Sequence, residues 1–200
     1  MMKRRNPTRY LVQAGMIAAL YVALTYLSNA LGLAYGMVQF RLSEALCILP
    51  LFTPAAVPGL AVGCIVGNLG SPMGVVDIVF GTLATLGAAL CTRALRQVRV
   101  RRLPLLPALM PVLWNAVVVG VELTIWLVPG KAFTLPVFFT NALWVAVGEV
   151  TIVYLLGIPL ALLLEKKGLH RQLFGEQINI FQLPSVHFAD GSFCLSRFFT

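Results

Sequence analysis

Charged and amide side chains are rare between residues 10 and 92 and between 103 and 164, and those present are of types that bind small polar molecules. Arg41 and Glu44 are three residues apart, so a helix would place them on one face. Each charge in hydrocarbon costs about 2.5–3.5 kcal/mol on insertion scales, so such residues usually serve a packing network or a substrate site. The candidate substrate-binding residues are Arg41, Glu44, Asn68, Asp77, Asn115, Glu122, Asn141, Trp144 and Glu149.

These residue types suit a small cationic or donor-rich molecule. A carboxylate can accept two hydrogen bonds from a ring N–H and a neighbouring amino group, amides can meet a carbonyl and ring nitrogens, and an aromatic ring can cover a planar face. A purine-like ligand fits this chemistry. Because we find no nucleophile motif and no metal-spaced His/Asp cluster, we predict a protein that is not an enzyme and holds neither cofactor nor metal.

Several of these residues also have a purely structural interpretation. Arg41 could pair with Glu44 or Asp77 to lock the fold, Asp77 could complement a helix N-terminus, and Trp144 could be a buried or interfacial aromatic. Glu122 and Glu149 are harder to explain in this way, because neither has a basic residue on its own helix. The sequence leaves both interpretations open.

The elements that must position these side chains are apolar enough to cross a membrane. Hydrophobic residues make up 59% of the chain and charged residues 11%, whereas soluble domains are roughly 25% charged. A spanning helix needs about 20 mostly apolar residues. We therefore predict an all-α integral membrane protein, a compact bundle of six transmembrane helices at residues 10–29, 40–53, 55–70, 74–95, 104–127 and 137–165.

The basic residues flank the apolar segments. The net charge is +8, and the clusters comprise Lys3, Arg4, Arg5 and Arg9, then Arg93, Arg96, Arg99, Arg101 and Arg102, then Lys166, Lys167 and Arg171. This arrangement is typical of cytoplasmic loops and disfavours nucleic-acid binding. Six spans would place every cluster and both termini in the cytoplasm, and the polar residues in the outer half of the membrane. The predicted organisation is a basic N-terminus at 1–9, a transmembrane domain at 10–165 and a cytoplasmic tail of unknown role at 166–200.

Small residues recur at four-residue spacing in two segments. Gly59, Gly63 and Gly67 form a smooth stripe that predicts close packing of another helix. In the first segment the small residues are Ala14, Gly15, Ala18 and Ala19. This flat surface could pack inside the protein or dock another membrane subunit, and the spacing alone does not separate the two.

The block QFRLSEALCILPLFTPAAVPGLAVGCIVGNLGSPMGVVDIVFGTLATL at residues 39–86 resembles the QueT family, as do NAVVVGVEL at 115–123 and VGE at 147–149. The resemblance runs over residues 10–165. It implies a substrate-binding S component of an energy-coupling factor (ECF) transporter in the bacterial cytoplasmic membrane, one that captures queuine or a related deazaguanine from outside.

The same resemblance implies partners. The first helix would dock a transmembrane coupling subunit through its small residues, Ala14 and Ala18 among them, and two separate ATPase subunits would hydrolyse ATP. The chain has no G-x-x-x-x-G-K-[ST] phosphate-binding motif of its own. Two alternatives remain, a stand-alone proton-coupled carrier and an S component for a different vitamin.

Overall fold

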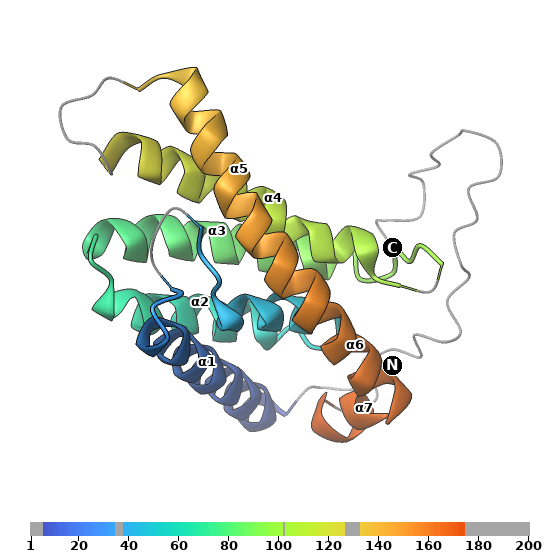
Figure 1. Ribbon diagram of the computed structural model, residues 1–200. Helices are drawn as coiled ribbons and strands as arrows, with labels where there is room; N and C mark the ends of the chain where they lie inside the picture. Colours follow the sequence, from blue (N-terminus) through green and yellow to red (C-terminus); the bar gives the residue numbers. More distant parts are fainter. Residues whose placement is uncertain (1–5, 35–37, 102, 127–132, 175–200) are drawn as a thin grey trace.

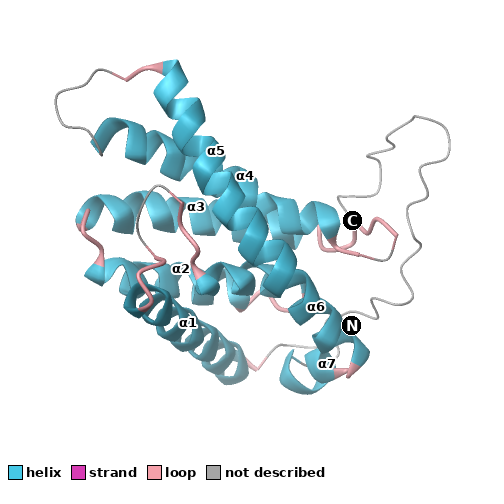
Figure 2. Ribbon diagram, in the orientation of Figure 1, coloured by secondary structure: helices cyan, strands magenta, loops and turns pink. Residues whose placement is uncertain are grey.

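The computed structural model describes residues 6–34, 38–101, 103–126 and 133–174, and the regular elements in these ranges are helical (Figures 1 and 2). Their order along the chain is α1 Pro7–Ala30, the 3-10 helix η1 Leu42–Leu51, α2 Ala56–Gly67, the 3-10 turn η2 Asn68–Gly70, α3 Val75–Ala94, α4 Leu105–Trp126, α5 Leu135–Ile152, the π-helical turn η3 Val153–Gly157, α6 Ile158–Lys166 and α7 Leu169–Phe174. The predicted all-helical class is confirmed.

Within the described ranges, four helices are long and apolar enough to span a membrane: α1, α3, α4 and the continuous helix Leu135–Lys166 that comprises α5, η3 and α6. The predicted segments at 40–53 and 55–70 coincide with η1 and α2, which are shorter. Ten residues of 3-10 helix rise only about 20 Å, and the hydrocarbon core is roughly 30 Å thick. The count of six spans and the orientation of the termini therefore stay predictions.

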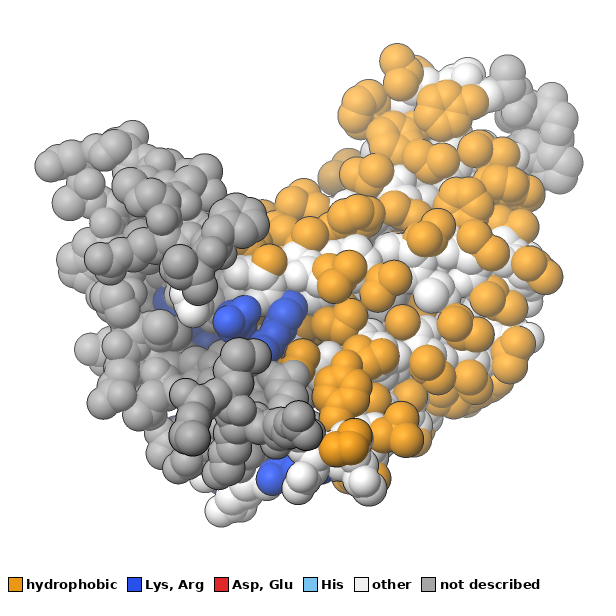
Figure 3. Space-filling model, turned by 180° about the vertical axis from the view of Figure 1, so that it is seen from behind, with side chains coloured by type: hydrophobic (Ala, Val, Ile, Leu, Met, Phe, Trp, Pro, Cys, Tyr) orange, Lys and Arg blue, Asp and Glu red, His pale blue; other side chains and the backbone are white. Residues whose placement is uncertain are grey.

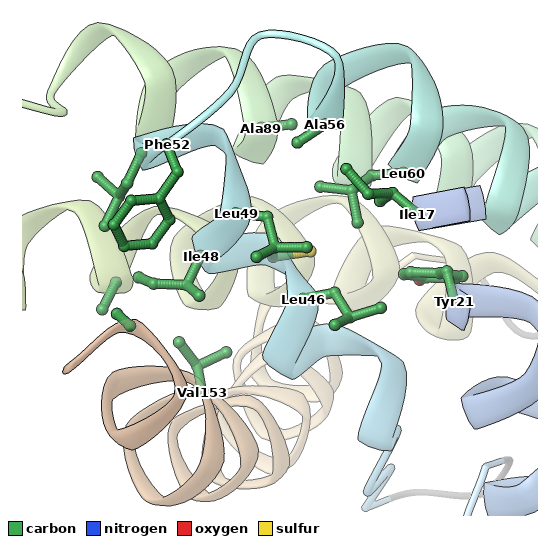
Figure 4. Packing of buried hydrophobic residues seen from close by; sticks show 14 of the residues in the cluster. Ile17, Tyr21, Leu46, Ile48, Leu49, Phe52, Ala56, Leu60, Ala89 and Val153 are labelled. Carbon is green, nitrogen blue, oxygen red and sulfur yellow. The ribbon is translucent and has the colours of Figure 1, made fainter. Parts of the chain in front are cut away.

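The short helix η1 runs through the middle of the protein (Figure 4). Every residue from Ser43 to Leu51 is buried. Leu46, Ile48 and Leu49 join one apolar cluster with residues of α1, α2 and the α5–α6 helix, and Figure 4 shows Tyr21 and Val153 on opposite sides of η1. Enclosure by its neighbours lets η1 depart from α-helical geometry at this depth, because unpaired backbone groups facing lipid would be costly.

Arginines mark the end of the molecule at which η1 finishes. Arg93, in the last turn of α3, donates from Nη1 to the backbone oxygens of Pro50 and Leu51 at 3.0 and 3.4 Å. Arg99 pairs with Glu165 at 2.7 Å, which ties the loop after α3 to α6. In Figure 3 the visible Lys and Arg side chains gather beside a large apolar face. The start of η1, at Arg41, therefore lies toward the opposite end of the bundle.

The glycine stripe of α2 packs against α1. A Cβ on Gly59 would lie 2.7 Å from the backbone oxygen of Ala14, and one on Gly63 would lie 3.1 Å from that of Ala18. The predicted close helix approach is therefore found. Ala14 and Ala18 are each only 9% exposed, whereas Gly15 and Ala19 are exposed. Internal packing thus accounts for Ala14 and Ala18, and of the four residues predicted to dock a partner only Gly15 and Ala19 lie on the surface.

We predict that Gly59→Ala destabilises the protein by about 1–3 kcal/mol, the usual cost of overpacking. Its new methyl group would meet a backbone oxygen, which cannot move aside as a flexible side chain would. Gly15→Ala is the matched control on α1, because a Cβ there meets nothing within 4 Å. Thermal unfolding in detergent should show a lower melting temperature for Gly59→Ala alone. Equal melting temperatures would contradict the close α1–α2 contact.

Candidate ligand-binding site

The site begins where the chain enters η1. Arg41 is the residue before the first turn of η1 and Glu44 lies within that turn. Both are buried, at 8% and 2% exposure. The Tyr21 hydroxyl of α1 donates to Glu44 Oε1, and the Cys47 thiol lies 3.1 Å from Glu44 Oε2. The carboxylate of Glu44 is thereby fixed between α1 and η1.

An amide of α4 bridges two carboxylates. Asn115 Nδ2 donates to Glu149 Oε1 at 2.8 Å and to Glu44 Oε2 at 3.4 Å. Asn115 and Glu149 are 5% and 6% exposed. The remaining oxygen of Glu149, Oε2, is buried and has no hydrogen-bond donor within the described ranges. Because an unsatisfied buried acceptor is costly, this oxygen is positioned to accept from a bound molecule.

A second chain of hydrogen bonds links η1 to η2 and α3. Arg41 Nη2 donates to Asn68 Oδ1, and Asn68 Nδ2 donates to the backbone oxygen of Asp77 at 3.0 Å. The Ser71 hydroxyl donates to Asp77 Oδ2. Asn68 can turn its amide toward α3 because Gly81 leaves room, since a Cβ there would lie 2.7 Å from Asn68 Nδ2. The guanidinium of Arg41 is thus held at the junction of three elements.

The parts of α4 and α5 away from the arginine-rich end contribute the remaining polar groups. Glu122 is fully buried, and neither carboxylate oxygen has a hydrogen-bond donor in the part of the chain that the structure describes. The carboxyl of Asp77 interacts with it across the α3–α4 contact. Asn141 Nδ2 donates to Thr124 Oγ1 at 3.2 Å, so this amide fastens α5 to α4.

Eight of the nine predicted binding residues are buried, at 9% exposure or less. All of these except Glu122 take part in the hydrogen bonds described above. Trp144 is the exception. It is 41% exposed and lies one turn before Gly148, where a Cβ would come within 2.1 Å of the Gln39 backbone oxygen. The structure brings the chain just before Arg41 against α5 at Gly148, but it does not bring Trp144 into the hydrogen-bonded groups. Whether any of these residues contacts a ligand remains a prediction.

Sequence reasoning missed Tyr21, which is only 1% exposed and is hydrogen-bonded to Glu44. Its spacing carried a signal. Ala14, Ile17, Ala18, Tyr21 and Thr25 are all buried, and they recur every three or four residues, as expected for one helix face. A tyrosine hydroxyl on that face must find a partner inside the protein.

We predict that Tyr21→Phe destabilises the ligand-free protein by about 1–3 kcal/mol, because it removes a donor from a buried carboxylate. Tyr26→Phe is the control, since Tyr26 lies on the exposed side of the same helix. The comparison is made by thermal unfolding of both variants in the same detergent. If the two variants melt alike, the Tyr21–Glu44 hydrogen bond contributes nothing to stability.

Comparison with known proteins agrees with this architecture. The family described as QueT transporter matches residues 11–166. A similar protein is the "Queuosine precursor transporter QueT" of Lactococcus lactis subsp. cremoris (strain MG1363), which is 34% identical over 83 residues, 42% of this chain and 48% of that protein. The alignment thus spans about half the length of that relative, and no solved structure matches the chain. With four helices able to span a bilayer and a family match over most of its length, the chain is a multi-pass membrane protein that belongs to the QueT transporter family.

Proposed function

We propose that this protein is the substrate-capturing S component of an ECF-type, ATP-driven importer in the bacterial cytoplasmic membrane. Its ligand is a queuosine precursor, queuine or a related deazaguanine, taken up from outside. The observation that carries the proposal is the bridge of Glu44, Asn115 and Glu149, which presents an unsatisfied carboxylate oxygen inside an otherwise apolar bundle. The family and the name of the Lactococcus relative support the choice of ligand.

The groups at this site match a deazaguanine in chemical type. Glu149 Oε2 can accept from a ring N–H or the exocyclic amino group, and Arg41 can donate to the ring carbonyl. Asn115 already donates one amide hydrogen to each carboxylate, and its oxygen is a further acceptor. Asn68 and Asn141 order Arg41 and the α4–α5 contact. Trp144 would cover a face of the planar ring as the ligand enters.

The site lies far from the basic end of the molecule. Asp77 and Arg93 lie near opposite ends of α3, sixteen residues apart, and 1.5 Å of rise per residue separates them by roughly 24 Å. Because clusters of arginine mark the cytoplasmic side, the polar groups lie in the outer half. A site at that depth is loaded from outside, as capture of a scarce nutrient requires.

Energy for uptake would come from partner subunits. The sequence has no phosphate-binding G-x-x-x-x-G-K-[ST] motif, and under this proposal a transmembrane coupling subunit and two ATPases supply the energy. Gly15 and Ala19 give α1 a smooth exposed strip flanked by Leu11, Met16 and Leu20. Small residues let helix backbones approach closely in a membrane, and this strip is where we place the coupling subunit.

We predict that the purified chain is stabilised against heat by a deazaguanine in a saturable manner, and that Glu149→Gln weakens binding more than tenfold, or about 1.4 kcal/mol. Glu165→Gln is the control, because Glu165 pairs with Arg99 instead. Thermal shift and titration calorimetry in detergent measure both effects. Stabilisation by another vitamin alone would overturn the ligand assignment, and unchanged affinity in Glu149→Gln would remove Glu149 from the site.

We also predict that cellular uptake requires the ATPase subunits, and that Ala19→Leu blocks uptake while ligand binding stays within twofold of the parent protein. Leucine at this position would hold the partner helix away from α1. Uptake of labelled ligand in cells with and without the coupling module checks this, and Val117→Leu at an exposed position of α4 is the control. If this chain alone supports uptake and uncouplers abolish that uptake, the proton-coupled carrier is favoured.

A further inference from the structure

The carboxyl groups of the site differ in how their hydrogen bonding is satisfied. Glu44 accepts from a tyrosine, a thiol and an amide, and Glu149 accepts from Asn115. Asp77 accepts from Ser71. Glu122 is fully buried, and both of its oxygens lack a donor within the residues that the structure describes. Within the described residues, Glu122 thus has no hydrogen-bond donor other than the carboxyl of Asp77.

The neighbourhood of Glu122 makes this arrangement costly. The nearest acidic partner is the carboxyl of Asp77, and two carboxylates side by side repel each other. The amide of Asn141 on α5 donates to Thr124. The hydroxyl of Thr124 donates in turn to the backbone oxygen of Gly120 at 2.7 Å. The protein therefore places an acidic pair at the α3–α4 contact.

The charge balance of the membrane region points the same way. Across the described residues from 10 to 92 and from 103 to 164, the charged side chains comprise one guanidinium and four carboxyl groups, namely Arg41, Glu44, Asp77, Glu122 and Glu149. One cation cannot neutralise four acids, and Arg41 acts on Glu122 and Glu149 alike. Buried charges in hydrocarbon need pairing. The described part of this region therefore carries more acidic than basic side chains.

We propose that Glu122 and Asp77 form a subsite for a monovalent cation, supplied either by the ammonium group of a bound ligand or by an inorganic ion. Two carboxyl groups suit a single positive charge, and the described residues contain no cluster of three metal-ligating side chains that would suggest a divalent metal. The version in which a ligand supplies the ammonium group rests on the function proposed above. It divides the site into a part at Glu149 that binds the ring and a part at Glu122 that binds a cationic substituent.

Binding of matched ligands to the purified full chain tests the ammonium source. The aminomethyl deazaguanine carries an ammonium group at neutral pH, whereas the cyano deazaguanine carries a neutral group at the same ring position. We expect the aminomethyl compound to bind at least tenfold more tightly. Glu122→Gln should abolish this preference while binding of the cyano compound stays within twofold, and Asp77→Asn should reduce it. Glu165→Gln is the control variant and should leave the preference intact.

Melting of the ligand-free protein in sodium chloride or choline chloride at one ionic strength tests the inorganic source. A stabilisation specific to sodium that Glu122→Gln removes would identify a bound inorganic ion. The same variant should raise the melting temperature in choline chloride, because a glutamine amide can donate to Asp77 where a carboxylate cannot. A residue that only fastens helices would lower it instead, in every salt.

The outcomes separate the two proposals. Sodium-specific stabilisation without binding of any deazaguanine would refute the proposed transport ligand and keep the cation subsite. Tight binding of both deazaguanines with no preference between them, together with no difference between the salts, would refute the cation subsite and keep the transport ligand. Equal loss of both ligands in Glu122→Gln, in protein that remains helical and monodisperse, would also overturn the subsite.

Discussion

Enclosure of η1 is the constraint on which the rest of the structure depends. A ten-residue 3-10 helix is too short to cross the bilayer, and its irregular hydrogen bonding is tolerated at membrane depth only inside protein. The neighbouring helices therefore have to surround it. On one side lies α1, which packs closely on the glycines of α2. On the other side lies the α5–α6 helix. The close α1–α2 contact and the complete burial of η1 are consequences of one requirement.

The same enclosure explains how the polar groups come together. Arg41 and Glu44, immediately before and within the first turn of η1, lie where α1, η2 and α4 each present a partner. Hydrogen bonds of this kind are worth more in a medium of low dielectric constant, and unsatisfied groups cost more. A short enclosed helix thus places Arg41 and Glu44 within reach of side chains from several surrounding helices.

Much of this arrangement could be predicted from the sequence, because hydrophobicity and charge are strong local signals. The apolar segments coincide with helices, and the glycine stripe of α2 meets another backbone. The identity of that partner could not be predicted. The stripe packs on α1, whereas sequence analysis left Ala14 and Ala18 between internal packing and a docking surface. Spacing shows that a helix face is smooth, and only the tertiary arrangement shows what covers it.

The polar residues illustrate the same limit. Their clustering at one end of the bundle followed from depth along each segment, but their pairing did not. Arg41 donates to the amide of Asn68, although sequence analysis considered carboxylate partners. Whether a side chain on a helix faces its neighbour or the lipid depends on the rotation of that helix, which single-residue spacing leaves undetermined. Tyr21 and Trp144 show both outcomes, the first buried and the second exposed.

The π-helical turn η3 sets the rotational phase of the long helix Leu135–Lys166. Before the turn the buried positions include Val145, Glu149 and Ile152. A regular continuation would bring Leu156 and Leu163 to the protein side, yet both are exposed, and Ile158, Ala161 and Leu164 are buried instead. A π turn accommodates an additional residue, which corrects the helix phase by about 100°. One continuous helix thereby directs two differently oriented faces toward the protein, one before the turn at the polar site and one after it at the apolar end.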